Sequence, residues 1–241
     1  MKAIIHPIKL GTQKNTDWSH VLLNTRFGEK FDSAFISYLI ISDGSILLVD
    51  TGHQLMKFSE GDNIDVIGNA EVAYREKFAG LGIAFKDVTH IILSHMHWDH
   101  MQNNHLFPNA KIYVQREEVR YAAAPIYPLY YERQDVAKLI GVDGHRTVFL
   151  DGDCELLPNV KLIFAGGHTP GSQMVLVNTK EGNVVMTGDI CNVYENLEIR
   201  SVKEMDVIAW VKAIQKVKLL ADIVLPQHDL RVFDKHIAIG L

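Results

Sequence analysis

Cysteine is scarce in this chain, because Cys154 and Cys191 are the only two among 241 residues. The disulfide framework of a small secreted domain needs more cysteines than this, so that class of protein is excluded. Isolated thiols are typical of a reducing compartment. We therefore expect a cytoplasmic protein.

Long apolar runs and clusters of basic residues are also missing. No apolar run approaches the roughly 20 residues that a membrane-spanning helix needs. Pro7 and Lys9 interrupt the early apolar stretch, so we expect no secretory signal. The net charge is −5, the pI is near 6.2, and no block of Lys and Arg offers a nucleic-acid-binding face. These absences predict no nucleic-acid partner and no membrane partner, and they leave monomer and dimer both open.

Metal-ligating residues are concentrated in one short stretch. An apolar run of strand type at residues 90–93 leads directly into His95, His97, Asp99 and His100. Histidine and aspartate are ligands of borderline and hard divalent cations. A single buried histidine is common in a protein core, but a core position does not account for the whole set. The stretch therefore predicts a metal site where a strand ends.

Hydrophobic patterning predicts strands at residues 2–10, 34–41, 46–49, 90–93, 110–115, 147–150, 160–164, 173–178, 184–187 and 221–225. Helices are expected at 69–81, 101–106 and 116–124. Ser201 and Glu204 are typical of a capping box before a further helix, whose apolar stripe is Val207, Ile208, Val211 and Ile214. Residues 11–32 and 53–68 are expected to be irregular. Two groups of strands, each followed by helices, predict two sheets packed face to face with helices outside, in one domain over residues 1–241.

Three other predicted strands also end in ligand-type residues. The strand at 160–164 leads to His168-Thr169-Pro170-Gly171, the strand at 184–187 to Gly188-Asp189, and the last strand to Gln227-His228-Asp229. Glycines beside these residues allow a close approach of the backbone. Together with Asp50-Thr51-Gly52 and the stretch from His95 to His100, this order of motifs resembles the metallo-β-lactamase superfamily. Length and layout are most similar to its N-acyl homoserine lactonase branch.

The resemblance implies an α/β (α+β) fold, an αββα sandwich with two mixed sheets, and two divalent metal ions. Zinc is the expected metal, with iron, manganese and cobalt as alternatives. By resemblance, His95, His97 and His168 hold the first metal, Asp99, His100 and His228 hold the second, and Asp189 bridges both. Asp50 either orients a ligand histidine or is a turn residue before Gly52.

The ligand set and the resemblance together imply a metal-dependent hydrolase. A hydroxide shared by the two metals attacks the carbonyl of a small ester-like substrate, with a lactone as the leading candidate, and Asp99 accepts or relays a proton. The alternatives are a thioesterase or other small ester or amide hydrolase, similar to glyoxalase II, and a mononuclear iron dioxygenase of the same fold. A β-lactam substrate and a nuclease are disfavoured, and His97 argues against a flavodiiron site.

The sequence also departs from the lactonase pattern. The tyrosine that usually follows the bridging aspartate by three residues is replaced by Asn192, and Tyr194 lies two residues further on. Both are candidate catalytic donors to the substrate carbonyl. Ser172 stands where a second histidine is common, and Met101-Gln102 stand where small residues are common. Cys191 is interpreted as a small buried apolar residue.

The pocket wall is expected to come from segments around the metal site. Candidates are Trp18 and Phe27, the insertion after His53, and the tyrosines at residues 127–131. Trp18 and its apolar neighbours can equally belong to a loop folded back on the core. His53 directly follows Asp50-Thr51-Gly52, so it is a candidate for substrate contact. Apolar and aromatic walls of this kind fit a small, partly apolar substrate.

Overall fold

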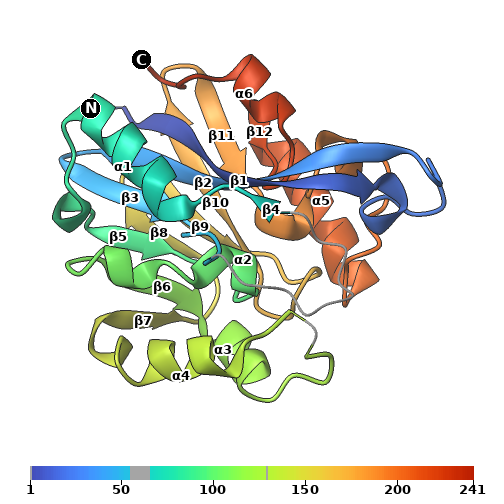
Figure 1. Ribbon diagram of the computed structural model, residues 1–241, viewed down its shortest axis with the longest axis horizontal. Coiled ribbons are helices and arrows are strands. Elements are labelled where there is room, and N and C mark those ends of the chain that lie inside the picture. Colours follow the sequence, from blue (N-terminus) through green and yellow to red (C-terminus); the bar gives the residue numbers. More distant parts are fainter. Residues whose placement is uncertain (1, 55–65, 129) are drawn as a thin grey trace.

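Two β-sheets form the centre of the molecule, with helices on their outer faces (Figure 1). The computed structural model describes residues 2–54, 66–128 and 130–241. Over those residues, one sheet has the strand order β4-β1-β2-β3-β5-β6-β7 and the other has the order β12-β11-β10-β9-β8. Both sheets contain parallel and antiparallel pairs. The predicted αββα sandwich with two mixed sheets is therefore confirmed.

The strands of the first sheet are β1 (Ile4–Asp17), β2 (Lys30–Ser42), β3 (Ser45–Val49), β4 (Val66–Ile67), β5 (His90–Ile92), β6 (Lys111–Gln115) and β7 (Thr147–Leu150). Those of the second sheet are β8 (Cys154–Leu157), β9 (Val160–Phe164), β10 (Gln173–Thr179), β11 (Gly182–Met186) and β12 (Ile223–Leu225). The helices are α1 (Ala70–Leu81), α2 (Trp98–Met101), α3 (Arg116–Ala123), α4 (Arg133–Ile140), α5 (Val207–Leu220) and α6 (Arg231–Lys235). None of the described helices is long and apolar enough to cross a membrane.

The apolar residues form layers that match this architecture. Alternate residues of the first sheet, such as Ile36 and Leu47, pack between the sheets against Leu162 and Val175 of the second sheet. The opposite face of the first sheet is covered by α1, α3 and α4. The outer face of the second sheet is covered by α5, mainly through Trp210. Each sheet thus buries both of its faces, which explains the long apolar runs in its central strands.

Parallel pairing brings the ligand-bearing strand ends together. In the first sheet, β3 pairs in parallel with β5, so Asp50 and Ser94 follow the ends of neighbouring strands. In the second sheet, β11 pairs in parallel with β12, so the loops that carry Asp189 and His228 also start side by side. Parallel neighbours end at the same edge of a sheet. All these loops therefore meet at one edge of the sandwich.

The predicted hairpin between 34–41 and 46–49 is present, because β2 and β3 pair antiparallel around Asp43 and Gly44. Both turn residues have positive φ (49° and 77°), as a tight two-residue hairpin turn requires. The predicted helix at 69–81 is also present. Asn69 caps it through a bond from the Val72 amide, and Gly82 ends it in the left-handed conformation.

The prediction that residues 11–32 are irregular was wrong at both ends. β1 continues to Asp17 and β2 begins at Lys30, and the two pair antiparallel along this length, with Asp17 opposite Lys30. The extension is polar and carries bulges, so it lacks the alternation that marks a half-buried strand. Trp18 stacks on Phe31 at 4.1 Å and packs in a separate small apolar cluster with Val21, Leu22 and Val193, outside the metal cluster.

Helix boundaries account for most of the other errors. A helix was predicted at 101–106, but α2 begins at Trp98, so Asp99 and His100 lie on its first turn. Ser201 and Glu204 do not cap α5, because Asp206 accepts the cap bond from the Ala209 amide at 3.0 Å. The helix itself is present, and Ile214 of its predicted apolar stripe is buried. The other buried residues of α5 are Trp210, Ala213 and Val217, whereas Ile208 and Val211 are exposed. Strands β4 and β8 and helices α4 and α6 had not been predicted, and β4 lies at the end of the segment 53–68 that was expected to be irregular.

Candidate metal centre

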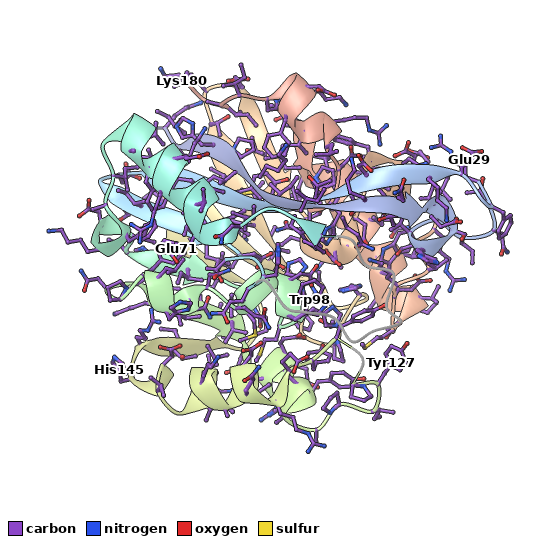
Figure 2. The ribbon with its side chains drawn as sticks, viewed as in Figure 1. Glu29, Glu71, Trp98, Tyr127, His145 and Lys180 are labelled. Carbon is purple, nitrogen blue, oxygen red and sulfur yellow. The ribbon has the colours of Figure 1, made fainter. Side chains whose placement is uncertain are left out.

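The residues with ligand-type side chains converge on one buried cluster where the strands end. His95 and His97 lie on the loop after β5, and Asp99 and His100 lie on α2. His168 follows β9, Asp189 lies in a short turn after β11, and His228 follows β12. The histidines are almost fully buried. Trp98, within the same stretch, lies near the middle of the molecule in Figure 2.

Within the described part of the chain, potential ligand atoms gather into three overlapping groups, in each of which the atoms lie within 4.8 Å of one another. These groups are His95, His97 and His168; His95, His100 and Asp189; and Asp99, His100 and His228. In the first group, Nδ1 of His97 lies 3.0 Å from Nε2 of His95 and 3.1 Å from Nε2 of His168. Three ring nitrogens therefore point at a common centre.

Asp189 lies between the two outer groups. Its Oδ2 lies 3.5 Å from Nε2 of His168, on the side of the first group. Its Oδ1 lies 2.9 Å from Nε2 of His228 and 3.4 Å from Nε2 of His100, on the side of the last group. Asp99 Oδ2 lies 3.5 and 3.6 Å from the same two nitrogens. One carboxylate thus offers one oxygen to each group.

The unpartnered atoms of the cluster fit a bound cation. His100 Nε2, His228 Nε2 and Asp189 Oδ1 are buried and have no hydrogen-bond partner among the residues that the structure describes. Leaving a buried polar atom unpaired costs about 1–3 kcal/mol, so three such atoms facing one another require a common partner. Imidazole nitrogens and carboxylate oxygens are the donor atoms that zinc and similar divalent ions select.

In three of the cluster histidines, the second ring nitrogen contacts a group outside the cluster. His100 Nδ1 lies 2.8 Å from Asp50 Oδ2, and His168 Nδ1 lies 2.8 Å from the Lys203 carbonyl. His228 Nδ1 lies 2.7 Å from the Ala34 carbonyl. Contacts of this kind set the tautomer and ring orientation of a ligand histidine. They leave Nε2 of these three histidines free to face the centre.

Asp50 makes the contact expected of an orienting residue. Besides His100, its carboxylate accepts bonds of 2.7 Å from both the amide and the hydroxyl of Ser94. Asp50 is fully buried and has a φ of 58°, a backbone conformation that is uncommon for a residue other than glycine. Ser94 also contacts His95 Nδ1 at 3.0 Å, although the sequence did not single it out. The contacts favour orientation of a histidine over a simple turn role.

Burial and mutual charge set the protonation of the cluster. Burial lowers the pKa of His95 and His97, and it lowers the pKa of His168 to about 4. These imidazoles are therefore neutral, which is the form that binds metal. Burial also acts against a charged His100, but Asp99 and Asp189 raise its pKa overall. The surrounding histidines hold the pKa of both carboxylates below the usual range, despite the opposing effect of burial.

A family model described as the metallo-beta-lactamase superfamily matches residues 37–228, which include every residue of this cluster. The chain belongs to this superfamily. An N-acyl homoserine lactonase from Bacillus sp. is 30% identical over 191 residues, which cover 71% of this chain and 69% of the relative. A lactonase from Bacillus cereus is 33% identical over 148 residues, and the match spans only 52% of its length.

Solved structures of superfamily members show the same fold over nearly the whole chain. A quorum-quenching N-acyl homoserine lactone lactonase superimposes with a TM-score of 0.79 at 26% identity, covering 98% of this chain and 96% of the other. A mutant of AiiA from Bacillus thuringiensis, with N-decanoyl-L-homoserine bound at its active site, gives 0.80 at 25% identity, covering 98% and 97%. These similarities support the prediction that this superfamily member is an enzyme of the metal-dependent hydrolase type.

The two candidate donors that follow Asp189 are not brought to the open side of the cluster. The Asn192 side chain is fully buried and donates to the Asp189 carbonyl at 2.9 Å, so it stabilises the loop that carries Asp189. Tyr194 lies beneath the cations of α6, with Lys235 Nζ 3.9 Å and the Arg231 guanidinium 5.5 Å from its ring centre. Burial and Asp229 raise the pKa of Tyr194 to about 12.

A different tyrosine lies beside the cluster. The ring of Tyr130 is 5.2 Å from the ring of His97, and the Tyr130 carbonyl accepts a bond from the Trp98 amide at 3.0 Å. Tyr130 remains partly exposed. Burial raises its pKa, and the nearby Tyr127, Asp99 and Asp189 raise it further. The sequence placed this residue only in the pocket wall, since nothing local distinguishes it from its tyrosine neighbours.

His53 and the expected pocket wall are only partly brought to the site. The His53 ring packs 4.7 Å from Phe35 and 5.8 Å from Trp98, and Phe35 in turn contacts His228. Burial lowers the pKa of His53, with a small opposing effect from Asp99. Phe27 is 71% exposed on the β1–β2 arm. Most of the insertion expected after His53, residues 55–65, lies outside the described residues.

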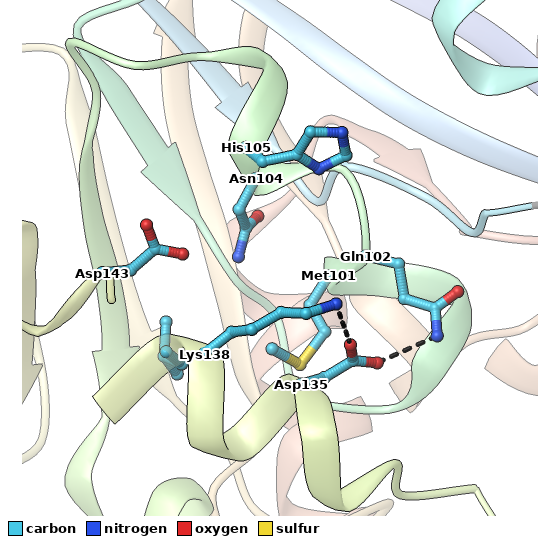
Figure 3. Close-up of a pocket in the computed structure, with 8 residues that line it drawn as sticks. Met101, Gln102, Asn104, His105, Asp135, Lys138 and Asp143 are labelled. Atoms are coloured by element: carbon cyan, nitrogen blue, oxygen red, sulfur yellow. Dashed lines mark hydrogen bonds and ion pairs between the residues drawn. The ribbon is translucent and has the colours of Figure 1, made fainter. Parts of the chain in front are cut away.

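The unusual pair Met101-Gln102 has a structural role near a small hollow behind α2 (Figure 3). Gln102 donates to Asp135 Oδ2 at 2.9 Å and accepts from the Gln54 amide at 2.9 Å. It thereby ties the loop after β3 to α4. This departure from the lactonase pattern therefore connects two scaffold segments and does not replace any candidate ligand residue.

Cys191 is a buried apolar neighbour of the centre, as interpreted from the sequence. It is fully buried among the residues that pack under α5, and burial raises the pKa of its thiol to about 12. A protonated, buried thiol reacts slowly. We expect Cys191 to resist a thiol reagent at pH 8 in the native protein and to react once urea unfolds it. Peptide mapping of the labelled protein checks this, and rapid native labelling of Cys191 would contradict its burial.

Proposed function

We propose that the protein is a dinuclear metal hydrolase that opens the ester bond of a small, partly apolar lactone. The position of Asp189, with one carboxylate oxygen toward each group of histidines, carries this proposal. The named lactonase relatives support the reaction class. The rings of Trp98, Phe35 and Tyr130 lie beside the cluster, and they are the proposed wall of the substrate pocket.

In this proposal the ligand roles follow the two outer groups. His95, His97 and His168 would hold one ion, Asp99, His100 and His228 would hold the other, and Asp189 would contribute to both. Zinc is the proposed metal because borderline nitrogen and oxygen donors predominate, and iron, manganese or cobalt would fit the same donors. When bound, such a pair of ions activates water near neutral pH and polarises a carbonyl.

The side chains of the protein position these groups and handle the proton. Asp99 is the least buried of the cluster residues, with 13% of its side chain exposed. Its carboxylate stays ionised because His100 and His228 lower its pKa against the effect of burial. We assign Asp99 to accept the proton that attack on the carbonyl releases and to pass it to the leaving oxygen. Asp50 and Ser94 hold the rings of His100 and His95 in the orientation that metal binding requires.

Tyr130 is the proposed donor to the substrate carbonyl, in place of Asn192 or Tyr194. Tyr130→Phe is expected to lower turnover about 10²–10³-fold, the usual loss for one such donor, or about 2.7–4 kcal/mol. Tyr194→Phe is the matched control, because the Tyr194 ring lies under Lys235 and its hydroxyl has no hydrogen-bond partner among the described residues. Steady-state kinetics of both variants decide which tyrosine donates to the substrate carbonyl. A large loss in Tyr194→Phe with none in Tyr130→Phe would restore the assignment based on the sequence.

A hydrolysis screen of the purified, metal-analysed protein tests the proposed function. The panel contains N-acyl homoserine lactones, simple γ-lactones, thioesters and aryl esters. We expect the lactones to have the highest kcat/KM. Preference for a thioester would favour the glyoxalase II-like alternative. One iron per chain, with oxygen consumption and no hydrolysis, would favour the dioxygenase alternative and overturn the proposal.

We also propose a cytoplasmic location. Both cysteines are free thiols in the structure, and Cys191 is completely buried. Unpaired cysteines are typical of proteins in a reducing compartment. Cell fractionation with an antibody against the protein tests this location, and recovery from the culture medium would contradict it.

A further inference from the structure

A buried carboxylate outside the metal cluster connects both of the loops that carry the first histidine group. Glu118 lies on α3 and is fully buried. Its Oε1 accepts bonds from the Met96 amide at 2.8 Å and from the Tyr131 hydroxyl at 3.0 Å. Its Oε2 accepts bonds from the Thr169 hydroxyl at 2.7 Å and from the Gly171 amide at 3.1 Å.

These four donors belong to the surroundings of the first group. Met96 lies between His95 and His97 in the chain, and Thr169 directly follows His168. The ring of Tyr131 packs edge-on against His97 at 4.7 Å. One carboxylate therefore contacts the loops or packing neighbours of all three histidines, although it is not itself a ligand.

The packing around Glu118 shows that this arrangement is specific. A Cβ atom at Gly171 would lie 2.1 Å from the Glu118 amide nitrogen and 2.4 Å from its Cα, so only glycine allows the loop to approach α3 this closely. The carboxylate has four acceptor positions, and all four are used. Glu118 forms no salt bridge among the described residues. Burial raises the pKa of its carboxyl, and the four hydrogen bonds oppose that rise.

We propose that Glu118 is the positioning residue of the first metal site, holding the loop of His95 and His97 and the loop of His168 at the separation that binding requires. The inference rests on the proposed metal site but not on the identity of the substrate. An ionised carboxylate suits this role because it accepts on both sides at once. In a glutamine side chain only the amide oxygen can accept hydrogen bonds. Its NH₂ group would face the donors on the other side.

Glu118→Gln is therefore the decisive substitution. Whichever way the amide is turned, its NH₂ group faces either the Met96 amide or the Gly171 amide, and a backbone N–H cannot reverse its role. One of the two histidine loops is then released. Thr169→Val is a milder variant, because it removes a single donor and leaves the Gly171 bond in place.

The experiment measures metal binding rather than hydrolysis. Zinc affinity is determined by competition with a chelator, and the visible absorption of the cobalt-loaded protein reports ligand geometry. We expect Glu118→Gln to weaken zinc binding about 10–100-fold, as loss of an outer-shell contact does, and to alter the cobalt spectrum. Thr169→Val should cause a smaller change in the same direction.

Asp135→Asn is the control for loss of a buried carboxylate. Asp135 accepts from Gln102 and contacts neither histidine loop. It should keep parental zinc affinity and spectrum even if the melting temperature falls. Unchanged zinc affinity in Glu118→Gln, or an equal loss in Asp135→Asn, would overturn the proposal. If Glu118→Gln does not fold, an unchanged affinity in Thr169→Val would overturn it. Failure of the parent protein to bind zinc would instead contradict the proposed function.

Discussion

Asp189→Asn is expected to lower the turnover number by several orders of magnitude. The substitution keeps the size of the side chain but replaces one carboxylate oxygen with an NH₂ group, which cannot bind a cation. Oδ1 of Asp189 lies 2.9 Å from His228 Nε2, and Oδ2 lies 3.5 Å from His168 Nε2, so either orientation of the amide leaves one histidine group without its carboxylate. It also removes a negative charge that favours cation binding at both groups.

Steady-state kinetics and elemental analysis of the same preparation measure this effect. We expect at least one ion to be bound more weakly, together with the loss of hydrolysis. Asp135→Asn serves as the control here too, since Asp135 is a buried carboxylate outside the cluster. A turnover within about tenfold of the parent, equivalent to about 1.4 kcal/mol of barrier, would show that Asp189 does not bridge the two groups.

Removal of metal is expected to abolish hydrolysis and to lower the stability of the fold. Without cations, His100, His228 and Asp189 retain buried atoms that have no hydrogen-bond partner. Any ion that binds the native state alone stabilises that state by mass action. We therefore expect a lower melting temperature in the metal-free protein, in addition to the loss of activity.

Titration of zinc into the metal-free protein checks both effects and the number of ions. Activity should rise to a maximum at two ions per chain, and the melting temperature should rise over the same range. Full activity at one ion per chain would contradict the dinuclear assignment. Retention of hydrolysis after complete removal of metal, verified by elemental analysis, would contradict the mechanism as a whole.

The convergence of the candidate ligand residues was predictable from the sequence because each lies just after a short apolar strand. His95 follows β5, Asp189 follows β11 and His228 follows β12, and parallel strands deliver such residues to one edge of a sheet. The residue types alone indicated divalent metal. The helix at 69–81 and the Asp43-Gly44 hairpin were also predicted correctly, since capping and turn chemistry depend on neighbouring residues in the chain.

Pairings over long distances in the sequence were not predictable in this way. The polar extension of β1 to Asp17 depends on its partner β2, and its bulges hide the period that marks a strand. Helix α5 was assigned the wrong cap, and its buried face was only partly predicted, because the sheet against which it packs decides which residues become buried. Asn192 and Tyr194 were candidates by sequence position, but the fold of their loop turned them to other partners.

By itself, the sequence determined the superfamily, the sandwich of two sheets and the residues that converge at their edge. These features depend on strand patterning and on short motifs, in which the interacting groups are neighbours in the chain. Only the tertiary structure decided what holds and surrounds the cluster. The Ala34 carbonyl reaches His228 across 194 positions, and Glu118 reaches Met96 and Gly171 across 22 and 53 positions. The neighbouring sequence does not indicate such a role for a backbone carbonyl or a helix glutamate, because the packing of the chain determines the partner.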